Sequence, residues 1–292
     1  MTFHLPLLII AAAFYRIAYK RHHQLFLRPQ PALRTPVIIV GSYLAGGAGK
    51  TPFTIWLAKR ILEQGKKVAV LCHSKAWDEF ILLQQELQPL GVTVIATKNR
   101  YATAKSIADK FGTILCDDGF EDTRFTGARY ICLDWQNSPR SIADLIPAGK
   151  CRSLEQDHRN SQTIHIDCYG KNGTSPDIRF SIESLTNYTP EESLTATAVC
   201  GLGSPERFIE DLRTFGINIE KTIIRPDHDK HFLQAVQREL SQSKHVVVSQ
   251  KDACRLPQSL LANPMLHTTV QKITVSEKTL KIINRAISTE TL

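Results

Sequence analysis

From Pro36 onward, short runs of β-branched and apolar residues alternate with longer amphipathic segments. Residues 37–40 predict a buried strand that ends at Gly41, and residues 52–64 carry apolar side chains at helical spacing before Gly65, which is placed to end the helix. This alternation is typical of βαβ units and of a mostly parallel sheet. Further strands are expected over residues 67–72, 92–96, 113–116 and 130–133.

The pattern changes near Cys151. Residues 163–167 and 178–182 alternate at period two on either side of a turn at 170–173, which predicts a β-hairpin linker. Beyond it, a second α/β unit is expected, with strands over residues 195–200, 220–224, 245–249 and 273–275.

The amino terminus combines an apolar run over residues 5–15 with a basic segment behind it. The run is too short for a helix that crosses a bilayer, which needs about 20 apolar residues, and a secretory signal would place its cations before the run. An in-plane or partly inserted membrane anchor fits this order better, with a core helix that has a solvated basic end as the alternative. The basic segment contains Arg16, Lys20, Arg21, His22 and His23.

Composition narrows the class of protein. The 292 residues are 42% hydrophobic and 22% charged, which excludes a disordered chain, a collagen-like fibre and a small disulfide-stapled domain. The formal net charge of +8 indicates an anionic partner, for which nucleic acid, phospholipid head groups and nucleotide phosphates are candidates. Nucleic acid is not favoured, because the chain has neither an aromatic stacking ladder nor a basic recognition helix.

The cysteines indicate a reducing compartment. Seven of them are dispersed without a C-x-x-C pair, so neither a disulfide framework nor a zinc site is indicated. Cys116 and Cys132 lie within apolar runs and are expected to behave as small buried hydrophobes.

The strongest chemical signal is a glycine-rich turn between the first strand and the first helix. A phosphate-binding loop needs small residues whose backbone N–H groups turn toward phosphate oxygens, a lysine that reaches the β and γ phosphates, and a hydroxyl that holds Mg²⁺. Lys50 and Thr51 meet the last two needs, although the strict G-x-x-x-x-G-K-T pattern would place glycine at Leu44. The expected ATP-binding residues are Gly46, Gly47, Ala48, Gly49, Lys50 and Thr51.

A second signal is the apolar strand at 113–116, which is followed by Asp117 and Asp118. In P-loop enzymes an acid at the end of such a strand lies near Mg²⁺, whereas Asp-Asp-Gly alone is an ordinary turn. Because the chain also contains a phosphate loop, we favour the interpretation in which Asp117 and Asp118 lie near Mg²⁺. The segment 201–206 starts like a dinucleotide fingerprint, but it lacks the third glycine and describes a helix start with Ser204 as N-cap and Pro205 at the first helical position, so NAD binding is rejected there.

These motifs, in this order, resemble the tetraacyldisaccharide 4′-kinases, the lipid A 4′-kinases of Gram-negative bacteria. The similarity covers the glycine-rich opening at 40–52, the D-D-G-F motif at 117–120 and a P-x-G-x-x-R segment at 147–152. In the second half it covers a G-x-G-x-P-E-R-F motif at 201–208, D-H at 227–228 and K-D-A at 251–253.

The resemblance implies an α/β fold of two α/β/α units with mostly parallel sheets, of which the first is P-loop NTPase-like. It also implies transfer of the ATP γ-phosphate to the 4′-hydroxyl of a tetraacylated glucosamine disaccharide 1-phosphate, giving lipid IVA, at the cytoplasmic face of the inner membrane. ATP and Mg²⁺ are the expected cofactors, and no obligate protein partner and no nucleic acid are expected. The expected parts are a membrane-anchor helix and basic segment (1–35), a P-loop kinase domain (36–160), a β-hairpin hinge (161–192) and a second α/β domain (193–292).

The resemblance also assigns roles to residues. The family's base falls on Asp78 and is oriented by a histidine that falls on His228, so that catalysis depends on hinge closure. Arg100 and Arg152 are expected to contact substrate or phosphate. The expected metal-side residues are Thr51, Asp117 and Asp118, with Glu121 as a further carboxylate.

The chain departs from the family pattern at several positions. Trp77 and Phe80 replace the glycine and proline that flank the acidic pair in the family's G-D-E-P motif. The Gln and His that follow D-D-G-F are Glu121 and Asp122 here, and the Glu after the P-x-G-x-x-R arginine is Ser153. The alternatives are a different P-loop protein, such as a GTPase-type metal-insertion factor, and a membrane-bound nucleotide-binding scaffold that no longer turns over.

Overall fold

The computed structural model of the chain describes residues 5–158, 163–189, 193–227, 229–242 and 244–288. Contacts divide the chain into two compact units, and the chain passes between them at residues 179/180 and 274/275. Unit 1 comprises residues 1–179 and 275–292, and unit 2 comprises residues 180–274.

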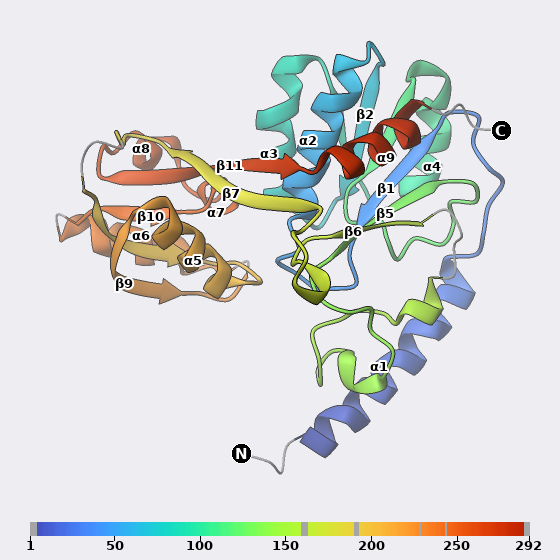
Figure 1. Cartoon of the computed structure of the whole chain (residues 1–292), viewed down its shortest axis with the longest axis horizontal. Helices are drawn as coiled ribbons and strands as arrows, with labels where there is room; N and C mark the ends of the chain where they lie inside the picture. The colour runs from blue at the N-terminus through green and yellow to red at the C-terminus, as the bar shows by residue number, and fades with distance from the viewer. Residues whose placement is uncertain (1–4, 159–162, 190–192, 228, 243, 289–292) are drawn as a thin grey trace. The chain divides into compact units, whose positions relative to one another are not determined.

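Unit 1 contains a six-stranded sheet in the order β3-β2-β4-β1-β5-β6, in which every neighbouring pair is parallel (Figure 1). The strands are β1 (Val37–Gly41), β2 (Val68–His73), β3 (Thr93–Thr97), β4 (Thr113–Cys116), β5 (Arg129–Asp134) and β6 (Thr163–Asp167). Because β1 lies between β4 and β5, its carboxyl end is where the chain direction of the crossovers reverses, which is where α/β sheets bind ligands.

Unit 1 also contains the helices of the first half of the chain and the last helix. In chain order they are α1 (Leu5–Phe26), α2 (Lys50–Glu63), α3 (Trp77–Leu87), α4 (Arg100–Ile107) and α9 (Glu277–Ser288). Helix α2 packs against β1, β2 and β4, and α3 packs against β2, β3 and α2. Tyr101 and Ala104 of α4 join Val37 and Ile39 in one buried apolar cluster, which also takes in Ala12 of α1. Short 3-10 helices lie at Gln88–Leu90, Ala108–Lys110, Ile142–Asp144, Glu155–Asp157 and Lys171–Gly173.

Unit 2 contains a five-stranded sheet in the order β7-β11-β10-β8-β9. Its strands are β7 (Ile178–Leu185), β8 (Thr195–Cys200), β9 (Asn218–Ile224), β10 (Val246–Val248) and β11 (Leu266–Val275), and its helices are α5 (Pro205–Phe215), α6 (Phe232–Ser241), α7 (Gln250–Ala253) and α8 (Gln258–Leu261). The pairs β8 with β9, β8 with β10 and β10 with β11 are parallel. The expectation of an α/β fold with mostly parallel sheets is confirmed.

Two details differ from the sequence-based expectations. Strands β6 and β7 do not form a hairpin, because β6 pairs with β5 in the first sheet and β7 with β11 in the second. Alternation at period two shows that a strand has one covered face, but it does not identify the neighbouring strand. Helix α9 also belongs to unit 1, where its carbonyls at Ala286 and Ile287 accept hydrogen bonds from Arg129 and Lys66 at 2.6 Å each.

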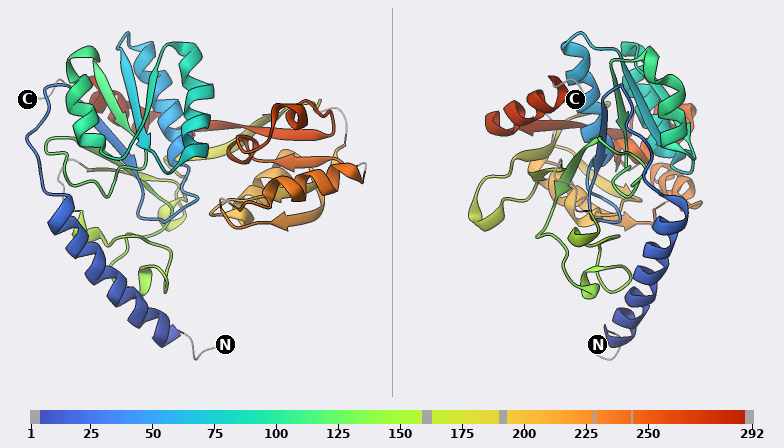
Figure 2. Two further views of the ribbon diagram at one scale, coloured as in Figure 1. Left: turned by 180° about the vertical axis from the view of Figure 1, so that it is seen from behind. Right: turned by 90° about the vertical axis from the view of Figure 1, so that its right-hand side faces the viewer.

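Helix α1 lies beside the segment around residues 142–157 (Figure 2). Tyr15 donates a hydrogen bond to the carbonyl of Arg152 at 2.8 Å, and Arg16 forms an ion pair with Asp157 at 3.3 Å. Among the described residues, no helix is both long enough and apolar enough to span a membrane.

Candidate active site

The glycine-rich loop joins the carboxyl end of β1 to the first residue of α2, which is Lys50. Gly47 and Gly49 have φ angles of 69° and 72°, a left-handed conformation that side chains disfavour and glycine adopts freely. The loop therefore presents the amino terminus of α2, where unpaired backbone N–H groups and the helix dipole attract anions.

The side chains of the loop meet the carboxyl end of β4. Lys50 Nζ lies 3.1 Å from Asp118 Oδ1 and is buried, with 7% of the residue exposed. Thr51 donates its hydroxyl to Asp117 Oδ2 at 2.9 Å, and Thr54, one helical turn on, donates to Asp117 Oδ1 at 2.7 Å. The structure thus brings the P-loop lysine and threonine together with both expected metal-side acids.

The two acids have opposite electrostatic environments. Burial raises the pKa of Asp117, which is completely buried, and the hydrogen bonds from Thr54 and Thr51 only partly offset this increase. Burial also acts on Asp118, but the charges of Lys50 and Arg152 outweigh it and hold the pKa of that carboxyl well below its usual range. Asp118 has a φ of 48°, a left-handed backbone conformation that is uncommon for a residue with a side chain.

Two arginines hold the turn that follows β4. Arg152 donates to both carboxylate oxygens of Asp118, at 3.1 and 2.9 Å, and to the carbonyl of Ala45 in the loop at 2.7 Å. Arg100 is buried and donates to the carbonyls of Asp117 and Asp118 at 3.0 Å each. Arg152 therefore links the loop to the acidic turn, while Arg100 fixes the backbone of the turn and leaves its buried Nε without a hydrogen-bond partner among the described residues.

Glu121 occupies a separate cluster next to this site. Ser153 donates to Glu121 Oε1 at 2.9 Å, and Tyr19 of α1 donates a short hydrogen bond to Oε2. His158 Nε2 lies 2.8 Å from the Ser153 hydroxyl and 3.8 Å from Glu121 Oε2. Burial raises the pKa of Glu121, so this carboxylate is costly to ionise without a cation nearby.

The expected base lies at the start of α3. Asp78 is completely buried and its Oδ1 accepts a hydrogen bond from the backbone N–H of Glu79 at 3.0 Å. Glu79 is only partly buried. Burial lowers the pKa of Arg152, but the negative charges of nearby carboxylates, first Asp118 and to a smaller extent Glu79, outweigh burial and raise it. Sequence reasoning did not single out Glu79, although it directly follows the assigned base.

The expected partner of the base, His228, lies outside the described residues. In unit 2, the other motifs of the second half meet at the carboxyl ends of β8 and β10. The backbone N–H of Gly201 donates to Asp252 Oδ2 at 3.1 Å, and Ser249 donates to the same oxygen at 2.8 Å. Pro205 opens α5, as predicted, so the segment 201–206 is a helix start.

With this geometry established, comparison with known proteins identifies the family. The family model described as tetraacyldisaccharide-1-P 4′-kinase matches residues 4–74 and 72–288. The chain belongs to this family. The expectation drawn from the motifs is therefore confirmed.

Named members of the family are moderately similar to this chain. The tetraacyldisaccharide 4′-kinase of Pseudoalteromonas translucida is 30% identical over 253 residues, which cover 76% of this chain and 75% of that protein. The enzyme of Chlamydia caviae is 28% identical over 267 residues, covering 75% and 72%. The crystal structure of LpxK from Aquifex aeolicus, described as a complex with ATP, superposes with a TM-score of 0.65 at 19% identity, over 97% of this chain and 98% of that one.

Membership of the 4′-kinase family does not explain every contact of the loop. Trp135 donates its indole N–H to the carbonyl of Ala48 at 2.9 Å, and Ser42 donates its hydroxyl to the carbonyl of Leu133 at 2.7 Å. Both contacts connect the loop to the end of β5. Trp135 stands in no motif, and the opening motif that includes Ser42 did not reveal its partner, because a bond between a side chain and a carbonyl leaves no constraint on residue type at the acceptor.

Proposed function

We propose that this chain transfers the γ-phosphate of ATP to the 4′-hydroxyl of a tetraacyldisaccharide 1-phosphate, which gives lipid IVA. The observation that carries the proposal is the pair of contacts between loop and turn, Thr51 to Asp117 and Lys50 to Asp118, in a chain of the 4′-kinase family. Relatives are named for this reaction, and the similar LpxK of Aquifex aeolicus was crystallised in complex with ATP.

Phosphoryl transfer needs positioning and charge neutralisation more than covalent chemistry, because its transition state is loose and spreads charge over the transferring oxygens. The backbone N–H groups of residues 46–51 bind the phosphates in this proposal, and Lys50 contributes its ammonium to them. Arg152 supports this role because it spans the loop and Asp118. Arg100 holds the backbone of the same turn, and we propose that its remaining donor faces the phosphate groups.

The donor set at the end of β4 fits Mg²⁺, which prefers hard oxygen ligands. The Thr51 hydroxyl and the Asp117 carboxylate, 2.9 Å apart, are the residues that would hold the ion, with Asp118 beside them. Burial raises the pKa of Asp117, and a bound cation would remove that penalty on its ionised form. Mg²⁺ would neutralise charge on the β and γ phosphates. Glu121 is engaged with Ser153 and Tyr19, so we place it next to the metal-side residues and not among the direct ligands.

The base that accepts the proton of the sugar hydroxyl comes from the first turn of α3. Asp78 carries this role by family resemblance, but a group that meets the substrate needs an accessible oxygen, and Asp78 is completely buried. Glu79 is partly exposed and interacts electrostatically with Arg152. We therefore propose that Glu79 contacts the hydroxyl and that Asp78 shapes the turn, while the orienting role of His228 stays a prediction.

Helix α1 supports docking on a membrane surface. Leu7, Ile10, Phe14 and Ile17 are spaced at i, i+3, i+7 and i+10, which places them on one face, and each is 54–69% exposed. The opposite face carries Tyr15 and Tyr19, which bind the body of unit 1. We propose that the exposed stripe enters the acyl boundary at the cytoplasmic face of the inner membrane, where the lipid substrate resides.

The activity is tested by transfer of labelled phosphate from ATP to tetraacyldisaccharide 1-phosphate in detergent, followed by thin-layer separation. The wild type is expected to label the lipid and Lys50→Ala to lose at least 10²-fold of that activity. Lys59→Ala is the matched control, since Lys59 lies on the same helix but is partly exposed and forms an ion pair with Glu86 at 2.8 Å. ATP binding without labelled lipid would contradict the proposal and favour a scaffold.

The base is tested by Asp78→Asn and Glu79→Gln under the same conditions. If Glu79 is the base, Glu79→Gln lowers kcat about 10²-fold or more with little change in KM, and Asp78→Asn acts mainly on stability. A large loss of kcat in Asp78→Asn with little change in Glu79→Gln would instead identify Asp78 as the base.

A further inference from the structure

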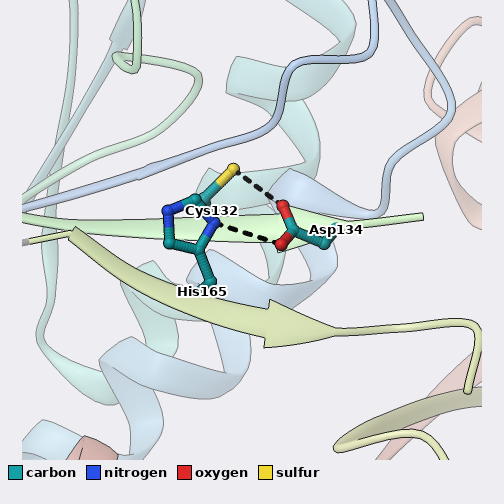
Figure 3. A group of neighbouring side chains, drawn as sticks. All are labelled: Cys132, Asp134 and His165. Atoms are coloured by element: carbon teal, nitrogen blue, oxygen red, sulfur yellow. Dashed lines mark hydrogen bonds and ion pairs between the residues drawn. The ribbon is translucent and has the colours of Figure 1, made fainter. Parts of the chain in front are cut away.

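A second cluster of reactive side chains lies at the edge of the six-stranded sheet, outside the residues assigned to catalysis. Cys132 and Asp134 are two positions apart on β5, so their side chains leave the same face of the sheet. His165 lies on β6, the edge strand, directly opposite Cys132 in the strand register. Figure 3 shows the three side chains pointing toward one another.

The donor atoms of the cluster are close to ligand spacing. Cys132 Sγ lies 3.3 Å from Asp134 Oδ1, and His165 Nδ1 lies 3.1 Å from Asp134 Oδ2 (Figure 3). One ligand atom from each of the three residues can be chosen so that all lie within 4.8 Å of one another. In a tetrahedral zinc site with metal–ligand bonds of about 2.0–2.3 Å, neighbouring donors are roughly 3.3–3.7 Å apart.

We propose that Cys132, Asp134 and His165 form a binding site for a divalent transition-metal ion of the zinc class. A thiolate, an imidazole nitrogen and a carboxylate suit Zn²⁺ and Co²⁺, whereas Mg²⁺ and Ca²⁺ select oxygen donors. Binding replaces the thiol S–H bond with a metal–sulfur bond, and the proton leaves to solvent. Three protein ligands leave the fourth position to water.

A lysine ammonium neutralises the carboxylate of this cluster in the structure. Lys171 Nζ lies 3.2 Å from Asp134 Oδ2, and Asp134 is nearly inaccessible, with 3% of the residue exposed. The Lys171 side chain is 36% exposed and that of His165 is 39% exposed, so the cluster opens to solvent on this side. A metal ion that enters here displaces a flexible ammonium and leaves the buried carboxylate neutralised.

The site is distinct from the ATP site but is connected to the phosphate loop by two contacts. Trp135, which follows Asp134, donates to the carbonyl of Ala48 in the phosphate loop. Tyr43 of the same loop stacks on His165 with ring centroids 6.4 Å apart. An ion bound to β5 and β6 would therefore be coupled to the loop through the strand end that braces it.

The test uses the full chain with its cysteines reduced and with saturating Mg²⁺, so that hard oxygen sites are filled. We expect Co²⁺ to give one equivalent per chain of a thiolate-to-cobalt charge-transfer band and the visible bands of tetrahedral Co²⁺, which Zn²⁺ then bleaches. Cys132→Ser and His165→Gln are expected to lose at least tenfold in Co²⁺ affinity. Lys171→Met keeps all three donors and is expected to retain the bands.

Two matched controls separate this site from general effects. Cys254→Ser changes a cysteine of unit 2, and His231→Gln changes an exposed histidine of unit 2, so both should bind Co²⁺ like the wild type. Circular dichroism checks that each variant is folded. The proposal fails if folded wild type shows no charge-transfer band, if Cys132→Ser keeps it, or if Lys171→Met loses it.

Discussion

The Ser153 hydroxyl donates a hydrogen bond of 2.9 Å to Glu121 Oε1, and this contact joins two positions at which the chain departs from its family's motifs. The motifs expect glutamine at position 121 and glutamate at position 153, whereas this chain has glutamate and serine. The contact therefore still contains one carboxylate, which is on residue 121 and not on residue 153, while Asp122 in place of the family's histidine adds a further acid. A hydrogen-bonded carboxylate is thus present beside the metal-side residues despite both substitutions.

Glu121→Gln is predicted to weaken the apparent Mg²⁺ affinity of the kinase about tenfold or more. It removes one negative charge from the group next to Asp118 while leaving a side chain of the same size, and outer-shell groups of metal sites commonly contribute 10–100-fold to affinity. The Mg²⁺ dependence of lipid phosphorylation at saturating ATP measures the effect.

The exchange Glu121→Ser with Ser153→Glu serves as the control for charge, since it keeps both side chains and returns the carboxylate to the position that the motif expects. We expect it to recover most of the lost Mg²⁺ affinity. Equal Mg²⁺ dependence of wild type, single and double variants would show that the carboxylate serves only to bind α1.

Tyr19→Phe is predicted to destabilise unit 1 more than Tyr15→Phe. Tyr19 donates to the partly buried carboxylate of Glu121, whereas Tyr15 donates to the neutral carbonyl of Arg152. Hydrogen bonds to charged groups contribute about 1.5–3 kcal/mol and those to neutral groups about 1 kcal/mol. Urea unfolding measures the difference, and Tyr169→Phe, whose hydroxyl meets Asn137 at the surface, is the control with little expected change. Equal effects of all three substitutions would contradict the prediction.

Gly41→Ala is predicted to disrupt the site through packing. A Cβ at Gly41 would lie 2.1 Å from Cβ of Phe120, so the D-D-G-F turn and the end of β1 cannot both keep their positions. We expect a loss of about 3 kcal/mol or more in unfolding free energy, because overpacking in a rigid core moves backbone. Gly112→Ala is the matched control, since the nearest atom to its new Cβ is 3.6 Å away, and it should be nearly neutral in the same unfolding experiment.

The sequence predicted much of unit 1 and little of its side-chain network. Strand β4 was predicted at its observed bounds, and the meeting of Lys50 with Asp118 follows from adjacent parallel strands whose carboxyl ends share one edge. The pairing of β6 with β5 and the return of α9 to unit 1 were missed, because both depend on partners distant in the chain.

The cluster of Cys132, Asp134 and His165 was missed for a related reason. A metal site from one strand and its neighbour has donors at i, i+2 and across the register, and this spacing resembles no C-x-x-C signature. Arg152 shows the opposite case, since its motif marked it but did not reveal that it bridges Asp118 and Ala45.

His158 is predicted to make stability depend on pH between about 6.5 and 4. Burial lowers the pKa of this histidine to about 4 from the ordinary 6.5, so in this window the unfolded chain binds a proton that the folded chain excludes. Stability contributed by the neutral ring is complete above pH 6.5 and falls as the pH drops toward 4, by about 3 kcal/mol in all. His158→Phe, which keeps the stacking on Phe120, should show less loss in urea unfolding across this range. Parallel pH curves for wild type and variant would contradict the assignment.

The exposed apolar stripe of α1 is predicted to bind the protein to anionic bilayers. Phe14 and Ile17 are 69% and 63% exposed. Burying such side chains in the acyl boundary contributes about 1.5–3 kcal/mol each. The double variant Phe14→Ser with Ile17→Ser should therefore lower sedimentation with anionic phospholipid vesicles at least tenfold. Leu90→Ser removes an apolar side chain, 50% exposed, from the 3-10 helix after α3 and should leave vesicle binding unchanged. Activity on detergent-dispersed substrate should be similar in all three proteins, because α1 binds unit 1 through its other face. Unaltered sedimentation of the double variant would show that the stripe does not contact lipid.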